Sequence, residues 1–322
     1  MEEKLLHVSS SPHVRNTRNT TSIMLDVVIA LLPASIYGVY HFGWHSALVI
    51  IITVLTCVLS EYLWEKALHK KVTIKDLSAV VTGMILALNM PPMIPLWVPV
   101  IGGVFAIIIV KQLYGGLGQN FMNPALAARC FLLISFAGLM TNFSCAKIGF
   151  DSVTSATPLA MIKAGDLSTS LSDLYLGRIP GTIGEVSTIL LLFGALYLWV
   201  RDVVTLEVPL SYIATFAVFC LIFKNFDFHY MLCQLCAGGL VFNAFYMAND
   251  YVTSPRTPLG EIMYGVLLGI ITGIFRLFGA SAEGASYAVL LGNMLTPLID
   301  KAAIKIIKKI NRRNAFRKEA KA

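Results

Sequence analysis

The feature that most constrains this chain is a series of long apolar runs separated by short polar segments. An α-helix needs roughly 17–25 apolar residues to cross a bilayer, and several runs reach that length. Only 13% of the residues are charged and 57% are hydrophobic, whereas a soluble domain carries about a quarter charged residues. Helices satisfy their own backbone hydrogen bonds in lipid. The sequence therefore predicts an all-α polytopic membrane protein.

We predict about ten transmembrane helices in two related five-helix halves. A glycine-rich turn ahead of a helix occurs in each half, at residues 115–124 and 279–286, which is typical of internal repeats in transporters. The chain is divided into a cytoplasmic segment (1–22), a first membrane half (23–140), an external loop (141–183), a second membrane half (184–300) and a basic cytoplasmic tail (301–322). The predicted spans are 23–42, 47–65, 77–90, 96–111, 124–139, 184–200, 208–223, 230–247, 259–278 and 285–299.

The distribution of basic residues predicts the orientation in the cell membrane. The first run, from Ile23, lacks a small-residue cleavage site and is expected to stay as the first span. With both termini in the cytoplasm, twenty of the 25 Lys and Arg residues lie in inner segments, as the positive-inside rule requires. Nine of them follow Asp300, so the net charge of +7 indicates membrane headgroups rather than nucleic acid.

One polar string in the external loop carries the most specific signal. It reads Asp151-Ser152-Val153-Thr154-Ser155-Ala156-Thr157-Pro158. It resembles the flavinylation motif of Rnf D and Nqr B subunits, with serines at the usual glycine positions 152 and 155. The resemblance implies that a flavin transferase splits FAD and leaves FMN covalently joined to the hydroxyl of Thr157, with Asp151, Thr154, Ser155 and Ala156 completing the motif.

Four further stretches resemble the same family in register: 10–20, 111–124, 250–254 and 287–300. Nqr B subunits carry a longer N-terminal region, so the resemblance favours the D subunit of the Rnf complex. It implies an electron-transfer subunit of an ion-translocating ferredoxin:NAD⁺ oxidoreductase that exports Na⁺ or H⁺. The implied partners are the flavin-carrying G subunit, the membrane A and E subunits and the iron–sulfur B and C subunits.

Asn123 and Pro124 predict a helix start, because Asn is a good N-cap and Pro suits the first helical turn. The positive end of that helix would attract an electron-rich group. The preceding loop holds Asn120 and three glycines that permit close backbone approach. The close backbone approach at this segment could serve either helix packing or the binding of a second, noncovalent flavin such as riboflavin.

Three carboxylates, Asp26, Glu61 and Asp300, lie in or at the ends of apolar runs, where ionised groups need a partner or water. Each is a candidate for the ion path. The alternative is an ordinary carboxylate at headgroup level. Cys233 and Cys236 form a CxxC pair, but a cluster needs about four ligands, so we predict no metal site and no catalytic residue in this chain.

Two alternative functions stay open from the sequence. The first is a B-type subunit of a Na⁺-translocating NADH:quinone oxidoreductase, which differs in its electron acceptor. The second is a non-redox transporter or channel built on the two-fold repeat. A purified flavoprotein would be yellow and a non-redox transporter would be colourless, so visible absorbance distinguishes the two classes of protein.

Overall fold

The structure is a computed structural model. It describes residues 18–143, 158–164, 170–177, 179–185, 187–279 and 283–319, with side chains described as far as residue 312. All regular elements in these ranges are helices. The prediction of an all-α chain is therefore confirmed for the described residues. The flavinylation motif, residues 151–157, lies outside them.

The N-terminal helices begin with two long apolar ones, connected by the single residue Gly43, and continue with shorter ones. A π-helical segment, η2, continues α4 without a break. The elements are α1 (Thr20–Phe42), α2 (Trp44–Ala67), η1 (Ile74–Asp76), α3 (Ser78–Leu88), α4 (Trp97–Val104), η2 (Phe105–Gln112), α5 (Pro124–Ser135) and α6 (Ala137–Met140).

The C-terminal helices follow two short connecting helices and end in the longest helix of the chain. The connecting helices are α7 (Pro158–Lys163) and α8 (Leu171–Leu176). The C-terminal helices are α9 (Thr188–Val200), α10 (Glu207–Phe223), α11 (Phe228–Cys236), α12 (Leu240–Phe242), η3 (Asn243–Met247), α13 (Pro258–Phe278) and α14 (Ala285–Glu319).

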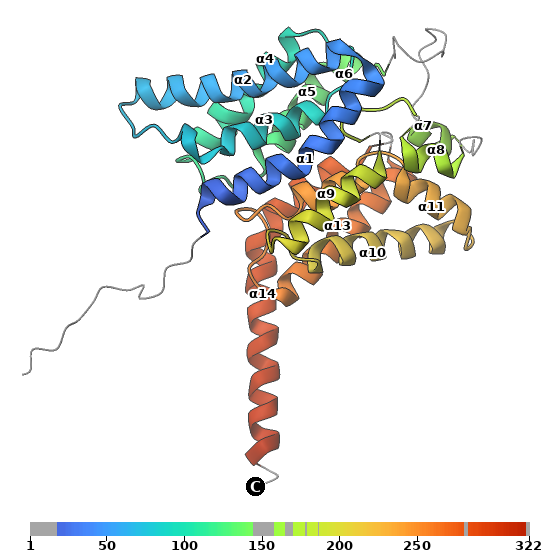
Figure 1. The fold of residues 1–322 in the computed structure, drawn as a ribbon. Helices are drawn as coiled ribbons and strands as arrows, with labels where there is room; N and C mark the ends of the chain where they lie inside the picture. The colour runs from blue at the N-terminus through green and yellow to red at the C-terminus, as the bar shows by residue number, and fades with distance from the viewer. Residues whose placement is uncertain are drawn as a thin grey trace, which may run out of the picture.

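The helices gather into two groups that follow the order of the chain (Figure 1). Helices α1–α6 lie together, and α9–α13 lie beside them, while α7 and α8 cover one end. Helix α1 packs against α9 and joins the two groups. The hydrophobic core extends through both, from Leu31 in α1 to Leu268 in α13.

Every predicted span overlaps a helix, but the helices differ in length. Only α1, α2 and α13 are long and apolar enough to cross a membrane by themselves, within the described residues. The predicted span 230–247 is not one straight helix, because α11 and the α12–η3 segment meet at a bend of 62°. Gly238 and Gly239 lie at this bend, and Gly238 has a φ of +67°, which favours glycine.

Small residues allow α13 to lie close to α10. Gly265, Gly269 and Gly273 recur every fourth residue, so they share one face of α13. A Cβ atom added at Gly269 would come within 2.7 Å of Thr215 Cβ and 2.9 Å of the Tyr212 carbonyl oxygen. This spacing of small residues is the usual device for close helix packing in membranes, where the hydrophobic effect does not drive association.

Candidate functional site

Two cavities lie at opposite ends of the helices. We call them the Asn120 pocket, of about 100 Å³, and the Pro158 pocket, of about 230 Å³. The Asn120 pocket is lined by the starts of α3 and α5, at Ser78 and Pro124. The Pro158 pocket is lined by the other ends of these helices, at Asn89 and Leu133. Any cofactors held in the two pockets would be separated along the length of the helix bundle.

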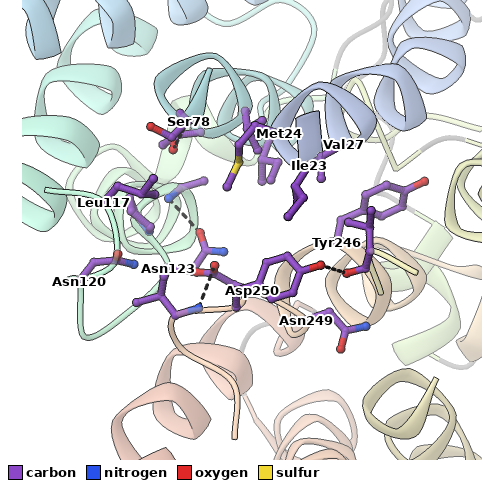
Figure 2. Close-up of a pocket in the computed structure, with 18 of the residues that line it drawn as sticks. Ile23, Met24, Val27, Ser78, Leu117, Asn120, Asn123, Tyr246, Asn249 and Asp250 are labelled. Carbon is purple, nitrogen blue, oxygen red and sulfur yellow. Dashed lines mark hydrogen bonds between the residues drawn. The ribbon is translucent and has the colours of Figure 1, made fainter. Parts of the chain in front are cut away.

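The Asn120 pocket is mostly apolar, with three asparagine amides and one carboxylate, that of Asp250, among its lining residues. Figure 2 shows Leu117 and Asn120 on one side and Tyr246 and Asn249 on the other, with Ile23 from α1 closing the space between them. This composition, apolar walls with a few fixed polar groups, is typical of cofactor sites.

The prediction that a helix starts at Asn123 is confirmed. The Asn123 Oδ1 atom accepts the backbone N–H groups of Ala125 and Leu126, at 3.1 and 3.3 Å, and Pro124 occupies the first turn. Both Asn120 and Asn123 line the Asn120 pocket. The structure thus brings together two residues that the sequence placed in one candidate flavin segment.

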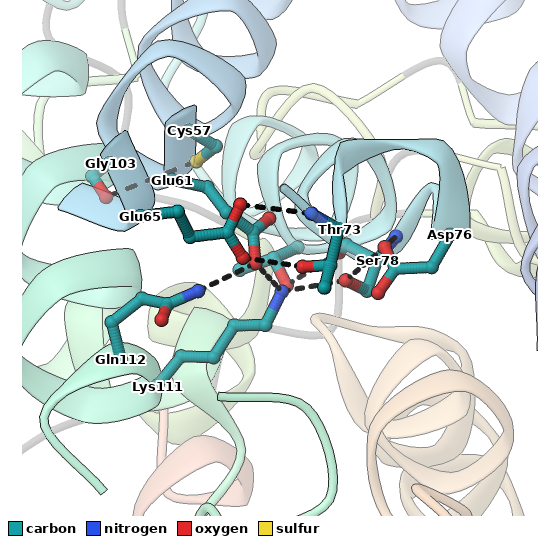
Figure 3. A network of polar contacts seen from close by, with 10 residues as sticks. Cys57, Glu61, Glu65, Thr73, Asp76, Ser78, Gly103, Lys111 and Gln112 are labelled. Carbon is teal, nitrogen blue, oxygen red and sulfur yellow. Dashed lines mark hydrogen bonds and ion pairs between the residues drawn. The ribbon is translucent and has the colours of Figure 1, made fainter. Parts of the chain in front are cut away.

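A buried ion pair adjoins this pocket (Figure 3). Lys111 Nζ donates to Glu61 Oε1 at 2.7 Å and to Ser78 Oγ at 2.6 Å. Gln112 Nε2 donates to the same Glu61 oxygen at 2.8 Å. The second oxygen, Glu61 Oε2, is buried without a hydrogen-bond partner among the described residues. The ion-path candidate Glu61 is thus neutralised by a lysine that also lines the Asn120 pocket.

The other two ion-path candidates occupy separate places. Asp26 accepts from the Tyr197 hydroxyl at 2.8 Å and lies 3.3 Å from Arg201 Nη2. Asp300 accepts the backbone N–H of Arg256 at 3.2 Å. Glu61, Asp26 and Asp300 therefore each have a local structural partner, and the structure does not bring the three into one site.

The Pro158 pocket contains the second buried charge cluster. Arg129 Nη1 donates to Glu185 Oε1 at 2.9 Å, and its guanidinium also pairs with Glu283 and with the Asn89 side chain. Arg129 is only 3% exposed. Its Nε–H is buried with no partner among the described residues, which leaves one donor for a ligand.

The bend between α11 and α12 borders the same cluster. Glu283 Oε1 accepts the backbone N–H of Gly239 at 3.3 Å, at the start of α12. On the other side of the bend, the fully buried Arg276 donates to the carbonyl oxygens of Gln234 and Ala237, at 2.6 and 3.2 Å. Charged side chains thus satisfy the backbone groups that the break exposes, as broken membrane helices require.

Helix α7 leads from the flavinylation motif into the Pro158 pocket. Pro158, Leu159 and Ala160 all line the cavity, and Pro158 and Leu159 are buried. Lys163 at the end of α7 donates to the carbonyl oxygen of Gly279, which ties α7 to the end of α13. Burial lowers the pKa of Lys163. The residue after Thr157 is therefore held at the pocket wall, although Asp151, Thr154, Ser155, Ala156 and Thr157 themselves are outside the described residues.

Four of the residues that define these sites were not predicted from the sequence: Lys111, Glu185, Arg276 and Glu283. The signal that could have identified them is an ionisable residue inside or beside an apolar run, which is costly unless partnered. This signal predicts that basic and acidic residues in different apolar runs form ion pairs. It does not predict which residue pairs with which.

Comparison with known proteins gives a consistent result. Residues 7–308 match the family described as NQR2, RnfD, RnfE. The chain is 45% identical to the D subunit of the Na⁺-translocating ferredoxin:NAD⁺ oxidoreductase complex of Acetobacterium woodii, over 100% of both chains. It is 40% identical to the D subunit of the proton-translocating ferredoxin:NAD⁺ oxidoreductase complex of Clostridium ljungdahlii, over 94% of this chain and 95% of the relative. It is 34% identical to the D subunit of the ion-translocating oxidoreductase complex of Halorhodospira halophila, over 90% of this chain and 92% of the relative.

Proposed function

Because the chain belongs to the NQR2, RnfD, RnfE family, we propose that it is a membrane electron-transfer subunit of an ion-translocating ferredoxin:NAD⁺ oxidoreductase. Relatives named as D subunits of such complexes align over almost their entire length, which favours this function over a non-redox transporter and over a quinone-reducing complex. The other subunits of the complex, iron–sulfur and flavin proteins among them, would be its electron-transfer partners.

The observation that carries the proposal is the position of α7. Its first residues, Pro158 and Leu159, line the Pro158 pocket, so an FMN joined to the preceding Thr157 would begin at the mouth of that cavity. We propose Thr157 as the attachment site, as the motif from Asp151 to Thr157 implies. A flavin transferase would supply the FMN group, and the flavin would supply the electron-carrying chemistry.

The residues of the Pro158 pocket suit a flavin ring. The unpartnered Nε–H of Arg129 can donate to a ring carbonyl or ring nitrogen, and the Glu185 carboxylate can accept from a ring N–H. The cavity volume of about 230 Å³ is below the roughly 300 Å³ at which small-molecule pockets begin. It therefore suits a ring system with its sugar and phosphate left in the loop, rather than a whole cofactor.

The Asn120 pocket is the proposed place of a second, noncovalent flavin such as riboflavin, although its volume of about 100 Å³ encloses only part of a flavin ring and leaves the rest of the molecule outside the cavity. Its apolar walls can cover the faces of a ring, while Asn120 and Asn249 offer amide groups at the rim. With one flavin at each end of the helices, electrons could cross the membrane within this chain. The support for this assignment is the lining of the pocket and its place opposite the Pro158 pocket.

Ion coupling and topology complete the proposal. We propose about ten spans in two related halves, with both termini in the cytoplasm and the flavin loop outside. The basic segment at residues 66–75 lies at the opposite end of the helices from α7 and α8 in Figure 1, which agrees with the positive-inside rule. Glu61, Asp26 and Asp300 are the candidates for conducting Na⁺ or H⁺.

Intact-mass and peptide mass spectrometry test the flavin directly. Chain purified from a host that contains the transferase should carry one added FMN, located on the peptide 151–163. Thr157→Ala should remove the added mass, whereas the matched change Thr154→Ala should keep it. Flavin on Thr154 or Ser155, or an unmodified chain despite the transferase, would refute the assignment to Thr157.

Thiol labelling tests the orientation. A cysteine at Leu171 should react with a membrane-impermeant reagent in intact cells, and one at Lys309 only after lysis. Both variants carry Cys145→Ser and Cys236→Ser, and the remaining native cysteines, Cys57, Cys130, Cys220 and Cys233, are buried, which keeps their background reaction low. Labelling of both introduced cysteines from outside would require an odd number of spans.

A further inference from the structure

Helix α14 continues well beyond the last point at which it packs on the rest of the protein. Thr296 Oγ1 donates to the Thr253 carbonyl oxygen at 2.8 Å, and Asp300 accepts the Arg256 N–H. These contacts place the Asp300 turn level with the loop between η3 and α13. The following residues, 301–312, are helical and mostly exposed, and we call them the α14 extension. Figure 1 shows α14 leaving the body of helices.

The α14 extension has one apolar face. Ala303, Ile306, Ile307 and Ile310 are three or four residues apart and so lie on one side of the helix, in line with the buried Ile299. Ile306 and Ile310 are 41% and 49% exposed, although the same stripe is covered at Ile299 and Ala303. The apolar stripe thus continues beyond the part of the protein that covers it.

The opposite face is basic. Lys301, Lys305, Lys308, Lys309 and Arg312 lie within one side of the helix and are all exposed. No acidic residue occurs between positions 301 and 312. A cationic face opposite an apolar face is the pattern of helices that lie in a membrane interface.

The direction of α14 favours this placement. In Figure 1 the red, C-terminal part of α14 runs across the direction of α2 and α10, and it lies towards the side on which α1 begins. A helix that continued along the direction of the spans would enter the water. A helix that crosses this direction at the level of Asp300 runs along the membrane surface instead.

We infer that the α14 extension lies flat in the membrane interface, where its basic face binds the phosphates of anionic lipid headgroups. The apolar face would enter the boundary of the acyl chains, next to the span it continues. The Lys and Arg side chains can reach up to the phosphates while their apolar stems stay against the lipid. This inference does not depend on the flavin, and it holds for either orientation of the chain in the membrane.

Fluorescence quenching in reconstituted vesicles tests it. A bimane label is placed on a cysteine at Ile310, or at Lys309 as the matched control on the basic face. Both variants carry Cys145→Ser and Cys236→Ser, and the full chain is reconstituted in vesicles of phosphatidylcholine with or without phosphatidylglycerol. A doxyl-labelled lipid reports contact with the bilayer, and acrylamide reports contact with water.

With phosphatidylglycerol, we expect the label at position 310 to be quenched by the lipid probe and protected from acrylamide, and the label at 309 to show the reverse. Salt at about 1 M should release the extension, because it shortens the Debye length to about 3 Å. Each of the changes Lys305→Gln and Lys308→Gln should lower the ratio of bound to free extension about fivefold, since each basic residue contributes about 1 kcal/mol near an anionic surface.

Two results would overturn the inference. Equal acrylamide quenching at positions 309 and 310 in phosphatidylglycerol vesicles would show that the extension stays in water. Protection of position 310 that requires other subunits of the complex, and that persists in pure phosphatidylcholine, would show that the apolar face binds a protein.

Discussion

Arg129 in α5 and Glu185 ahead of α9 form a buried ion pair, with 2.9 Å between Nη1 and Oε1, that links the two groups of helices. Glu283, ahead of α14, shares the same guanidinium. The cluster is one guanidinium and two carboxylates from three separate segments. Loss of the shared cation would leave the buried Glu185 carboxylate without its ion-pair partner at the Pro158 pocket.

Arg129→Met should therefore be strongly destabilising. Removing one partner of a buried ion pair costs about 3–5 kcal/mol. The stability of the Arg129→Lys chain should lie between those of the Arg129→Met chain and the native chain, because an ammonium keeps the charge but lacks the planar guanidinium that contacts several partners. Thermal unfolding of the detergent-purified chain measures both, with Arg256→Met, at an exposed arginine, as the control. A fully stable Arg129→Met chain would contradict the assigned role.

The Glu61–Lys111 pair permits a double-mutant test. Lys111→Met should destabilise the chain by about 3 kcal/mol, because it leaves the Glu61 carboxylate buried and unpaired. Adding Glu61→Gln should restore most of the loss, since a neutral amide no longer needs the lysine. The exposed Lys75→Met serves as a control. If Glu61→Gln changed the stability of the Lys111→Met chain by as much as it changes that of the native chain, the two side chains would act independently.

The contact of α13 with α10 should not tolerate a larger residue at position 269. Gly269→Ala should cost about 1–3 kcal/mol, because the new Cβ meets Thr215 and the Tyr212 carbonyl oxygen, which belongs to a rigid helix backbone. Gly138→Ala is the matched control, since its Cβ would meet nothing within 4 Å. Unfolding midpoints of the two variants should differ clearly, and identical values would exclude close packing at Gly269.

Asp300→Asn separates the charge of Asp300 from its hydrogen bond. The amide oxygen of Asn can still accept the Arg256 N–H, so the loop stays in place while the charge is lost. We expect the half-saturating cation concentration of the assembled complex to rise, with the covalent flavin retained. Asp300→Ala removes both functions. An unchanged half-saturation in Asp300→Asn, with weaker stability only in Asp300→Ala, would limit Asp300 to holding the loop.

The sequence predicts local features of this protein better than distant contacts. The Asn123 cap follows from two adjacent residues and was predicted correctly, because capping depends on the chain close by. The break within residues 230–247 was missed, although Gly238 and Gly239 were a visible signal for it. The partner of Glu61 could not be predicted, since Lys111 lies 50 residues away and meets it only through the packing of α2 against η2.

The Arg129 cluster shows the same limit. Arg129 lies near the inner start of the predicted span 124–139, whereas its carboxylates, Glu185 and Glu283, come from segments that the predicted topology places at the outer end. A one-dimensional charge count assigns each residue to the nearest loop. Such a count ignores two ways in which a charge is shifted along the membrane normal: a long side chain can reach away from its own backbone, and a helix can start within the bundle.

The number of residues per turn in the π-helical segment η2 determines the direction in which Lys111 points. The N–H of Leu113 donates to Ile108 and that of Gly116 to Lys111, each five residues back rather than four. A π-helical turn takes one residue more than an α-helical turn, so a regular α-helix over the same residues would rotate Lys111 by about 100° or more away from Glu61. Deleting one residue between positions 105 and 110 would let the segment relax to a regular α-helix that still directs Lys111 at Glu61. The extra residue that the π turns absorb is thus as much a part of the site as the lysine itself.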